Sequence, residues 1–379
     1  MAVIGPREVA AAMRVLARGD LARYYTAGDS EATKFENELA SWMDSAHALA
    51  LNSGTSALIC ALVGAEIGPG DEVLVPAYTW VSTAAAVISV GAVPILVDVD
   101  ESLTIDPIDI KARMTSATKA IIPVHMLNLV ADMDAIIAIA DEHDLLVIED
   151  ACQAIGVTYR GQATGSMGDV GVFSFNQHKN IRCGEGGALI TNSSKHYARA
   201  GMYHDVGSYQ RSEQFDLDEP AFVGVNSRMP ELSAAILRPQ VKRLEKQMNL
   251  RRKRRQMVVE RIVELNDPGM RISMHHDPAE AVGIAIAFDD PEHAARFGET
   301  KGARRLIDTG RHVYTNWQSI ISKHPQHPKL DPYAWNDREI TYDDDTCART
   351  LEILAQTCTV ELAPELPTPA FQMLLKRLG

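Results

Sequence analysis

Short aliphatic runs alternate with helix-like segments between about residues 47 and 195. This alternation is typical of a mostly parallel sheet covered by helices. One of the intervening helices is expected to follow Asp132. The pattern therefore predicts an α/β domain in the first half of the chain. The runs expected to be strands are residues 46–51 (AHALAL), 72–76 (EVLVP), 94–100 (PILVDVD), 120–126 (AIIPVHM), 145–151 (LLVIEDA), 171–175 (GVFSF) and 187–191 (GALIT).

The sequence changes character beyond about residue 230. A long basic helix is expected over residues 237–265, and the shorter mixed segments after it indicate a smaller α/β lobe. We therefore expect a large domain with an N-terminal helical segment over residues 1–240, and a connecting helix with a small C-terminal domain over residues 241–379. The run LRRKRRQ could contact nucleic acid, but the apolar residues at helical spacing around it favour the solvated face of a helix.

Charge and cysteine content restrict the partners and the compartment. The chain has 37 basic and 50 acidic residues, a net charge of −13, so neither nucleic acid nor an anionic membrane is an expected partner. Its five cysteines form no CxxC pair and are expected to be reduced thiols. No apolar stretch is long enough to cross a bilayer, and the first residues lack the core of a signal peptide, so a cytoplasmic location is expected. The acidic triplet Asp343–Asp345 is expected to be a solvated turn, and no metal is expected.

A lysine stands between two expected strands, in the stretch SFNQHKNIRCGEGGALIT over residues 174–191. Lys179 follows a buried strand and is flanked by groups without negative charge. Desolvation at such a place can keep a lysine deprotonated, which makes it a Schiff-base nucleophile. A lysine at a strand end is more often a solvated surface residue, so this motif needs independent support.

Support comes from Asp150, which directly follows the apolar run LLVIE. An acid at the carboxyl end of a parallel strand lies where open α/β sheets bind ligands. Pyridoxal phosphate needs such an acid, because a carboxylate against its pyridine nitrogen keeps the ring protonated and lets it act as an electron sink. Asp150 could instead cap a following helix, and Gln153 could either reach the ring hydroxyl or complete a capping box.

Two further strand ends carry residues suited to the same cofactor. The small residues Ser53, Gly54 and Thr55 expose backbone N–H groups and the positive end of a helix, which suits a phosphate, although Ser53 or Thr55 could simply cap that helix. Trp80 could stack on an aromatic cofactor or fill the core. Four strand ends that each suit one part of the same molecule are much less expected by chance than any one of them.

These motifs resemble those of the DegT/DnrJ/EryC1/StrS sugar aminotransferases, which are fold type I enzymes dependent on pyridoxal phosphate. The resemblance extends over nearly the whole chain. It implies a mostly parallel seven-stranded sheet in a large domain, with a smaller C-terminal α/β domain. It also implies transfer of an amino group from glutamate or glutamine to a keto-sugar. The matching segments are NSGTSAL, GPGDEVLVPAYTW, GAVPILVDVD, IEDACQAIG, GSMGDVGVFSF, HKNIRCGEGGALITN and GVNSRMPELSAAI.

The resemblance also implies a role for each site residue. Lys179 is the Schiff-base lysine, Asp150 pairs with the pyridine nitrogen, Gln153 contacts the ring oxygen, and Trp80 stacks on the ring. The residues expected around the phosphate are Ser53, Gly54, Thr55 and Ser174.

The family builds each site across a homodimer, and the segment GVNSRM matches the part that crosses over. Asn226 is then the phosphate ligand supplied by the partner chain, and Arg228 faces the carboxylate of the amino donor. A planar guanidinium suits that bidentate contact better than a lysine does. A surface ion pair between Arg228 and Glu231 is the alternative.

Departures from the family pattern leave the acceptor open. The run Asn176-Gln177-His178 replaces the small or hydroxyl residues that many members carry before the lysine, and it resembles the version in cyclitol (scyllo-inosose type) aminotransferases. His178 is expected either to touch the substrate or only to pack. ACQAIGVTYRGQATGSMGDVG, CGEGGALITN and ARTLEIL resemble the branch that aminates the 8-position of an octulosonate. Members with histidine in place of the lysine are sugar dehydratases, an alternative that Lys179 disfavours.

Overall fold

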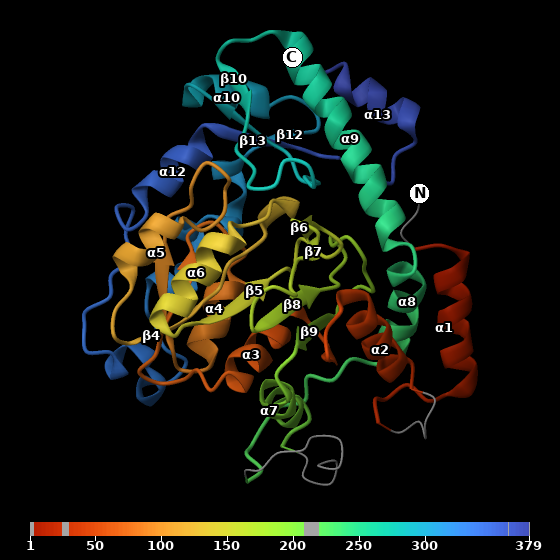
Figure 1. Ribbon diagram of the computed structural model, residues 1–379, viewed down its shortest axis with the longest axis vertical. Coiled ribbons are helices and arrows are strands. Elements are labelled where there is room, and N and C mark those ends of the chain that lie inside the picture. Colours follow the sequence, from red (N-terminus) through yellow and green to blue (C-terminus); the bar gives the residue numbers. More distant parts are fainter. Residues whose placement is uncertain (1–3, 25–29, 208–219, 363, 379) are drawn as a thin grey trace.

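A seven-stranded sheet forms the centre of the larger part of the molecule (Figure 1). The computed structural model describes residues 4–24, 30–207, 220–362 and 364–378. The strand order is β1-β9-β8-β5-β4-β2-β3, and β9 is antiparallel to both of its neighbours while the other neighbouring pairs are parallel. The predicted mostly parallel seven-stranded sheet is therefore confirmed. Its strands are β1 (His47–Leu51), β2 (Glu72–Pro76), β3 (Val93–Val97), β4 (Thr118–Ile121), β5 (Leu146–Asp150), β8 (Val170–Ser174) and β9 (Gly187–Thr191).

Two of these strands have the predicted bounds, and others end earlier than their aliphatic runs. β2 and β9 begin and end where the sequence indicates. β4 stops at Ile121, five residues before the end of the run 120–126. Pro123 follows closely, and because it has no amide hydrogen it cannot continue the hydrogen-bonded ladder. An aliphatic run thus marks burial more reliably than it marks pairing.

Helices cover the sheet, and short polar side chains fix where several of them begin. Ser53 caps α3 by accepting a hydrogen bond from the amide of Ser56 at 3.0 Å. Asp132 caps the expected helix α6 through the amide of Ala135 at 3.3 Å. The covering helices are α2 (Glu31–Met43), α3 (Gly54–Gly64), α4 (Ser82–Ser89), α5 (Pro107–Arg113), α6 (Met133–His143) and α7 (Ser194–His204).

The long basic helix predicted over residues 237–265 is two helices in the structure. α8 (Glu231–Val241) contains Pro239 in its interior, and α9 (Leu244–Leu265) begins after Arg243, whose backbone is not helical (φ −122°, ψ 11°). The Arg243 guanidinium contacts the carbonyl oxygen of Pro239 at 3.1 Å and Glu8 of α1 (Pro6–Arg18) at 2.5 Å. The break therefore lets α8 pack beside α1 while α9 continues toward the C-terminal part (Figure 1).

A second, smaller apolar core surrounds a four-stranded antiparallel sheet of order β10-β11-β13-β12. Phe288, Phe297 and Phe371 are among the side chains buried there, together with the apolar face of α9 around Val258. The strands of this sheet and two helices that pack on it are β10 (Met270–Ile272), β11 (Ala285–Phe288), β12 (Ala303–Arg305), β13 (Thr357–Val360), α10 (Pro291–Gly298) and α13 (Thr368–Leu375). The predicted domain boundary at residue 240 stays a prediction.

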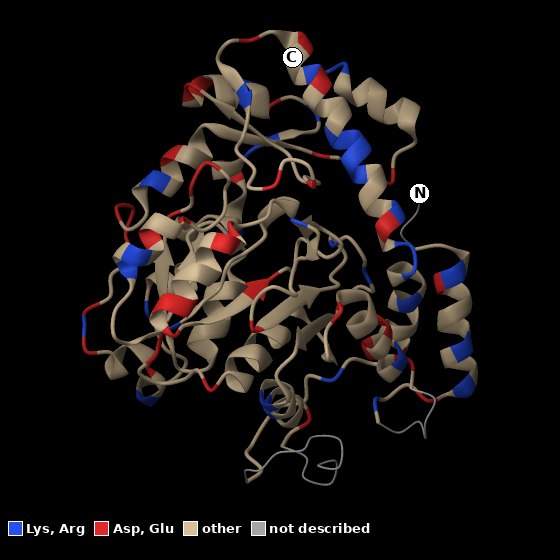
Figure 2. Cartoon of the chain, in the orientation of Figure 1, with Lys and Arg blue, Asp and Glu red and all other residues tan. Residues whose placement is uncertain are grey.

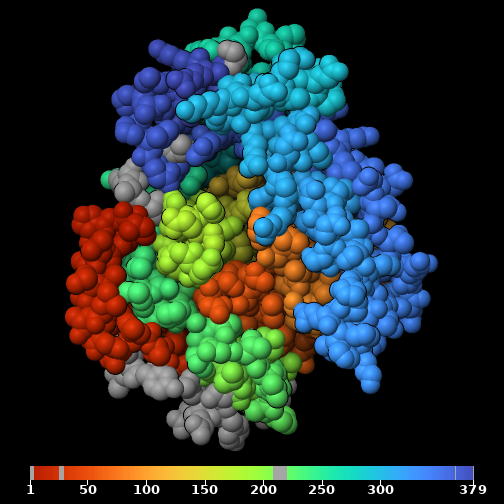
Figure 3. Space-filling model, turned by 180° about the vertical axis from the view of Figure 1, so that it is seen from behind, coloured from red at the N-terminus to blue at the C-terminus, as the bar shows by residue number. Residues whose placement is uncertain are grey.

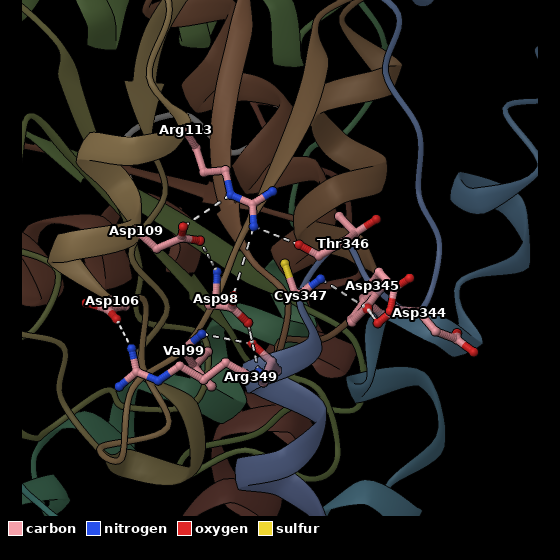
Figure 4. Close-up of polar contacts among 12 residues, drawn as sticks. Asp98, Val99, Asp106, Asp109, Arg113, Asp344, Asp345, Thr346, Cys347 and Arg349 are labelled. Carbon is pink, nitrogen blue, oxygen red and sulfur yellow. Dashed lines mark hydrogen bonds and ion pairs between the residues drawn. The ribbon is translucent and has the colours of Figure 1, made fainter.

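Part of the C-terminal region belongs to the large core and not to the small one. Tyr314, Trp317 and Tyr342 are buried among the side chains of the large domain. Figure 4 shows two arginines that link the large domain to the segment around α12 (Ala348–Ala355). Arg113 extends from α5 toward that segment, and Arg349 extends from α12 toward Asp106. Arg113 donates to the carbonyl oxygen of Thr346 at 2.7 Å. Residues 306–354 are therefore packed on, and hydrogen-bonded to, the edge of the large sheet formed by β3 and the segment after it.

No helix among the described residues has both the length and the apolar character needed to cross a bilayer.

Candidate active site

A cavity of about 480 Å³ lies at the carboxyl ends of β1, β2, β5 and β8. Because these four strands run in the same direction, the residues that follow them meet at one edge of the sheet. Nine of the eleven residues predicted from the sequence line this cavity, whereas Asn226 and Arg228 do not. The nine are Ser53, Gly54, Thr55, Trp80, Asp150, Gln153, Ser174, His178 and Lys179.

Asp150 is the last residue of β5 and is 4% exposed. Its Oδ2 atom accepts a hydrogen bond from the Thr83 hydroxyl at 2.9 Å, and its Oδ1 atom accepts one from the amide of Cys152 at 3.1 Å. No helix follows directly, so the alternative that Asp150 caps a helix is wrong. Burial, and then the Asp150 carboxylate, raise the pKa of the Cys152 thiol well above its usual value, while Lys179 acts in the opposite direction. A fixed carboxylate and a nearby lysine thus share the cavity.

Lys179 lies in the loop between β8 and β9 and is partly exposed. Its amide donates to the carbonyl oxygen of Asn176 at 3.0 Å, and a backbone bridge between Asn176 and Gly184 closes the loop. Within the described residues, its Nζ atom has no hydrogen bond or ion pair. The lysine is therefore held by its backbone while its amine stays available to a ligand in the cavity.

The N-terminus of α3 lines the cavity and lies very close to the end of β8. A Cβ atom on Gly54 would lie 2.8 Å from the Cβ of Ser174 and 3.0 Å from the Sγ of Cys152, so only glycine permits this approach. The Thr55 hydroxyl donates to Ser82 at 3.0 Å. The result is a helix N-terminus flanked by hydroxyl groups, which is the type of site that binds phosphate.

Trp80 lines the cavity beside His312, and Arg311 of the same distant segment also contacts the indole ring. Its ring centre lies 5.1 Å from that of His312 and 5.5 Å from the guanidinium carbon of Arg311. The indole is 39% exposed, so the alternative that it fills the core is wrong. Burial lowers the pKa of His312, and because its Nδ1 atom contacts the carbonyl oxygen of Thr309, the proton of the neutral ring is on that nitrogen. Its Nε2 atom is then left as an acceptor.

Gln153 and His178 both line the cavity, but only the side chain of Gln153 is fixed by a hydrogen bond to the protein. The side-chain oxygen of Gln153 accepts a hydrogen bond from the amide of Leu127 at 3.1 Å, so the capping-box alternative is wrong. This bond leaves the amide nitrogen of Gln153 free to donate to a ligand. His178 is exposed, and its backbone amide contacts the side chain of Asn176 at 3.3 Å.

Asn226 and Arg228 lie outside the cavity of their own chain. Asn226 is exposed and forms a backbone bridge with Asp205. Arg228 forms an ion pair with the buried carboxylate of Asp205, so the predicted alternative of a pair with Glu231 is wrong. Glu231 instead accepts hydrogen bonds at the start of α2, including one of 2.7 Å from the Ser30 hydroxyl. The roles predicted for Asn226 and Arg228 therefore stay predictions about a second chain.

Ten of the described residues that line the cavity were not among the predicted site residues, and Thr83, Arg304 and His312 are three of them. Thr83 lies in the first turn of α4, three residues after Trp80. A hydroxyl so soon after a strand end could have been used to predict it as a site residue. Arg304 and His312 come from the C-terminal part of the chain. Nothing in their local sequence indicates contact with a sheet edge formed more than 100 residues earlier.

The chain is similar to curated aminotransferases over part of its length. The chain is 39% identical over 243 residues to L-glutamine:2-deoxy-scyllo-inosose aminotransferase of Streptoalloteichus tenebrarius, covering 62% of this chain and 57% of that protein. It is 42% identical over 247 residues to UDP-N-acetyl-3-dehydro-alpha-D-glucosamine 3-aminotransferase of Acidithiobacillus ferrooxidans, covering 64% and 65%. The chain thus spans about three-fifths of the length of the curated relatives it matches.

Similarity to solved structures extends further along the chain. The aminotransferase of Psychrobacter cryohalolentis superposes with a TM-score of 0.80 at 28% identity, over 98% of this chain and 95% of that one. This likeness confirms the predicted fold type I architecture. Residues 5–327 match the model of the DegT/DnrJ/EryC1/StrS aminotransferase family. The chain therefore belongs to the DegT/DnrJ/EryC1/StrS aminotransferase family.

Proposed function

We propose that this protein is a pyridoxal-phosphate-dependent aminotransferase that moves an amino group from glutamate or glutamine to the ketone of a sugar. Its product would be an amino sugar for a glycan or a natural product. The observation that carries the proposal is the single cavity shared by Lys179, the buried Asp150 and the start of α3. Family membership and the two aminotransferases compared above support the same activity.

The residues of the cavity fit the three parts of this cofactor. The N-terminus of α3, with Ser53, Thr55 and the Gly54 approach to Ser174, suits a phosphate dianion. Asp150 supplies one buried carboxylate for a ring nitrogen. The remaining requirement is an amine for the aldehyde, and Lys179 meets it. Trp80 provides an aromatic face, and Gln153 has a free amide donor for a ring oxygen.

When bound, the cofactor would supply an electrophilic carbonyl and a conjugated ring that accepts electrons from the substrate carbon. Asp150 would hold a proton on the ring nitrogen, and Thr83 and the Cys152 amide keep its two oxygens in place. The Lys179 amine would take a proton from the donor and return it at a neighbouring atom, acting as general base and then general acid. Trp80 and His312 would restrict access of water to one side.

We include a homodimer with shared sites in the proposal. Asn226 is exposed next to Val223 and Val225, which are 89% and 48% exposed. α1 also carries exposed apolar residues at helical spacing, Val9 and Met13 among them. Figure 3 shows the red N-terminal helices beside the green segment that contains residues 220–230. A second copy bound at this face by two-fold symmetry would bury the apolar groups and bring Asn226 and Arg228 to the other chain's cavity.

A cytoplasmic location is a further part of the proposal. The five cysteines are all free thiols in the structure, as is expected in a reducing compartment.

Amine formation tests the proposed activity directly. The holoenzyme is incubated with a panel of keto-sugars, free and nucleotide-linked, and with either glutamate or glutamine, and products are measured by mass spectrometry. Formation of an amino sugar that requires both partners is expected. A product that has lost water without gaining nitrogen would indicate the dehydratase alternative instead.

An amino-cyclitol is the second candidate product. The first of the two relatives, whose name specifies glutamine and 2-deoxy-scyllo-inosose, favours it, as does the run Asn176-Gln177-His178. Including scyllo-inosose and an 8-keto-octulosonate in the panel separates these two alternatives from a nucleotide-linked acceptor. The cyclitol candidate requires turnover with scyllo-inosose that exceeds turnover with every sugar in the panel.

A further inference from the structure

A second cleft of about 640 Å³ continues from the lysine toward α9 and β13. The two spaces are contiguous, because both are lined by Gln153, His178, Lys179, Arg304 and His312. A substrate that reacts near Lys179 can therefore extend into the second cleft. The side chains at its far end determine which substrates fit there.

The basic run of α9 contributes one of those side chains, and most of the run has a structural use. Arg252 forms an ion pair with Glu280 at 3.1 Å. Arg254 is 3% exposed and donates to backbone carbonyl oxygens of the loop after β13, and Arg255 donates to another carbonyl at 3.0 Å. The prediction that this basic run forms the solvated face of a helix is therefore only partly correct. Figure 2 shows this run as the blue band of α9, against the small domain.

Arg251 is the member of the run that lines the second cleft. In the described part of the chain, its guanidinium has neither a hydrogen bond nor an ion pair. Burial is the main influence that lowers its pKa, and Arg182 and Arg254 add to this effect. Glu365 acts in the opposite direction, but its carboxylate is already paired with Arg182. A partly buried cation that lacks a counter-ion is an unfavourable arrangement that a bound anion would relieve.

The other charges of the cleft favour the same kind of ligand. Among the described residues, the guanidinium of Arg304 has one hydrogen bond, a long one of 3.4 Å to the carbonyl oxygen of Asp308. Glu361 and Glu365 are the carboxylates among the described residues that line the cleft, against Lys179 and three arginines. Arg304 lines both the first cavity and the second cleft, as Lys179 does, whereas Arg251 lines only the second cleft. Arg251 therefore lies at the end of the cleft away from the reacting group.

We propose that Arg251 is a specificity-determining residue that binds an anionic group of the acceptor, with Arg304 nearer the lysine. The acceptor is then a keto-sugar that carries a carboxylate or a phosphate some distance from its ketone. A planar guanidinium can hold either group with two parallel hydrogen bonds. This inference rests on the proposed function, because it assigns one end of the substrate whose other end reacts at Lys179.

Direct binding to the holoenzyme tests the assignment without turnover. Two probes are titrated by calorimetry at fixed moderate salt: UDP, which carries a diphosphate, and 3-deoxy-octulosonate, which carries a carboxylate. Arg251→Gln is expected to raise the Kd of at least one probe by about tenfold or more, since a charged hydrogen bond is lost. The probe that is affected identifies the anionic group.

Arg252→Gln is the matched control, because Arg252 is adjacent on α9, carries the same charge and is paired with Glu280 outside the cleft. It is expected to change either Kd by less than about twofold, because its guanidinium is already paired with Glu280 and does not line the cleft. The proposal is overturned if wild type binds neither probe, if Arg251→Gln changes neither Kd, or if the control loses as much affinity. The protein could bind a probe through Arg251 and still form no amine from any ketone. That result would support the anion site and reject the proposed activity.

Discussion

At the scale of single residues, the cavity combines groups that are fixed with one that is free. Asp150 is held by Thr83 and by the amide of Cys152, whereas the amine of Lys179 has no partner among the described side chains. This division suits a site in which one group keeps a permanent charge and the other moves protons. It leads to two separate predictions.

Lys179→Ala should abolish amine formation, because no other lysine lines the cavity in the part of the chain that the structure describes. Borohydride treatment of the wild-type holoenzyme should attach the cofactor to the peptide that contains residue 179, as peptide mass mapping would show. Lys195→Ala is the control, since Lys195 forms an exposed ion pair with Glu66 and should keep full activity. Label on another lysine, or normal turnover by the variant, would show that Lys179 is not the reactive group.

Asp150→Asn should retain the cofactor but slow amino transfer by about a hundredfold or more, on the scale of deleting one preorganised polar group. The substitution keeps the size of the side chain and an oxygen for the Cys152 amide, and it removes the charge. Thr83→Val leaves the charge and removes the 2.9 Å hydrogen bond to Asp150, together with the 2.9 Å hydrogen bond to the Thr79 hydroxyl, so a smaller loss is expected. Each half-reaction is followed by cofactor absorbance. Equal rates for Asp150→Asn and wild type would leave Asp150 with a purely structural role.

The sequence was sufficient to predict the site residues that follow strands, but not the contacts made by residues from distant parts of the chain. Asp150 and Lys179 each stand next to an aliphatic run, so their place at a sheet edge could be predicted. The ion pair of Arg228 with Asp205 could not, because it depends on how two extended segments 23 residues apart come together. His312 likewise reaches the cavity only because its segment packs on the large core.

At the scale of elements, the aliphatic runs were sufficient to predict the sheet but not the direction of every strand. β9 is antiparallel to its neighbours although its sequence, GALIT, resembles the parallel strands. The short connection of 12 residues from β8 explains this finding, because a parallel crossover usually needs a helix and this loop is used to place Lys179. The contact between α12 and the β3 edge is a second feature with no local signal.

Thr350 links those two elements and is fully buried. Its hydroxyl donates to Asp98 at 2.7 Å and accepts from the amide of Val99 at 2.9 Å. Thr350→Val should lower the free energy of unfolding by about 1–3 kcal/mol, because it leaves a buried donor and a carboxylate oxygen without that partner. Chemical denaturation measures the change.

The control for this prediction is Lys111→Ala, on the nearby helix α5. Lys111 and Glu142 are 57% and 63% exposed and 3.7 Å apart, so the loss should stay below about 1 kcal/mol. If both variants are equally stable, the hydrogen bonds of Thr350 do not fasten α12 to the sheet.

At the scale of the whole molecule, one chain places nine of the predicted residues around its cavity and leaves two on an exposed surface. Asn226 and Arg228 follow a segment with exposed valines, and they lie far along the sequence from the other expected phosphate ligands. A closed two-fold dimer would explain both the exposed apolar groups and the missing ligands, because each chain would give its segment to the other.

Mixing two inactive variants distinguishes a ligand supplied by the partner from one that serves its own chain. Lys179→Ala and Asn226→Ala should each be impaired when assayed alone, because every site then has one damaged element. In a heterodimer, one site combines both damaged elements and the other is intact. Random exchange makes half of the dimers heterodimers, so activity should rise toward about a quarter of wild type. Exchange is verified by native mass spectrometry, and Arg228→Ala replaces Asn226→Ala if the latter retains too much activity. Complete exchange without recovery of activity would mean that Asn226 serves the site of its own chain or none, and the exposed valines would then need a different partner.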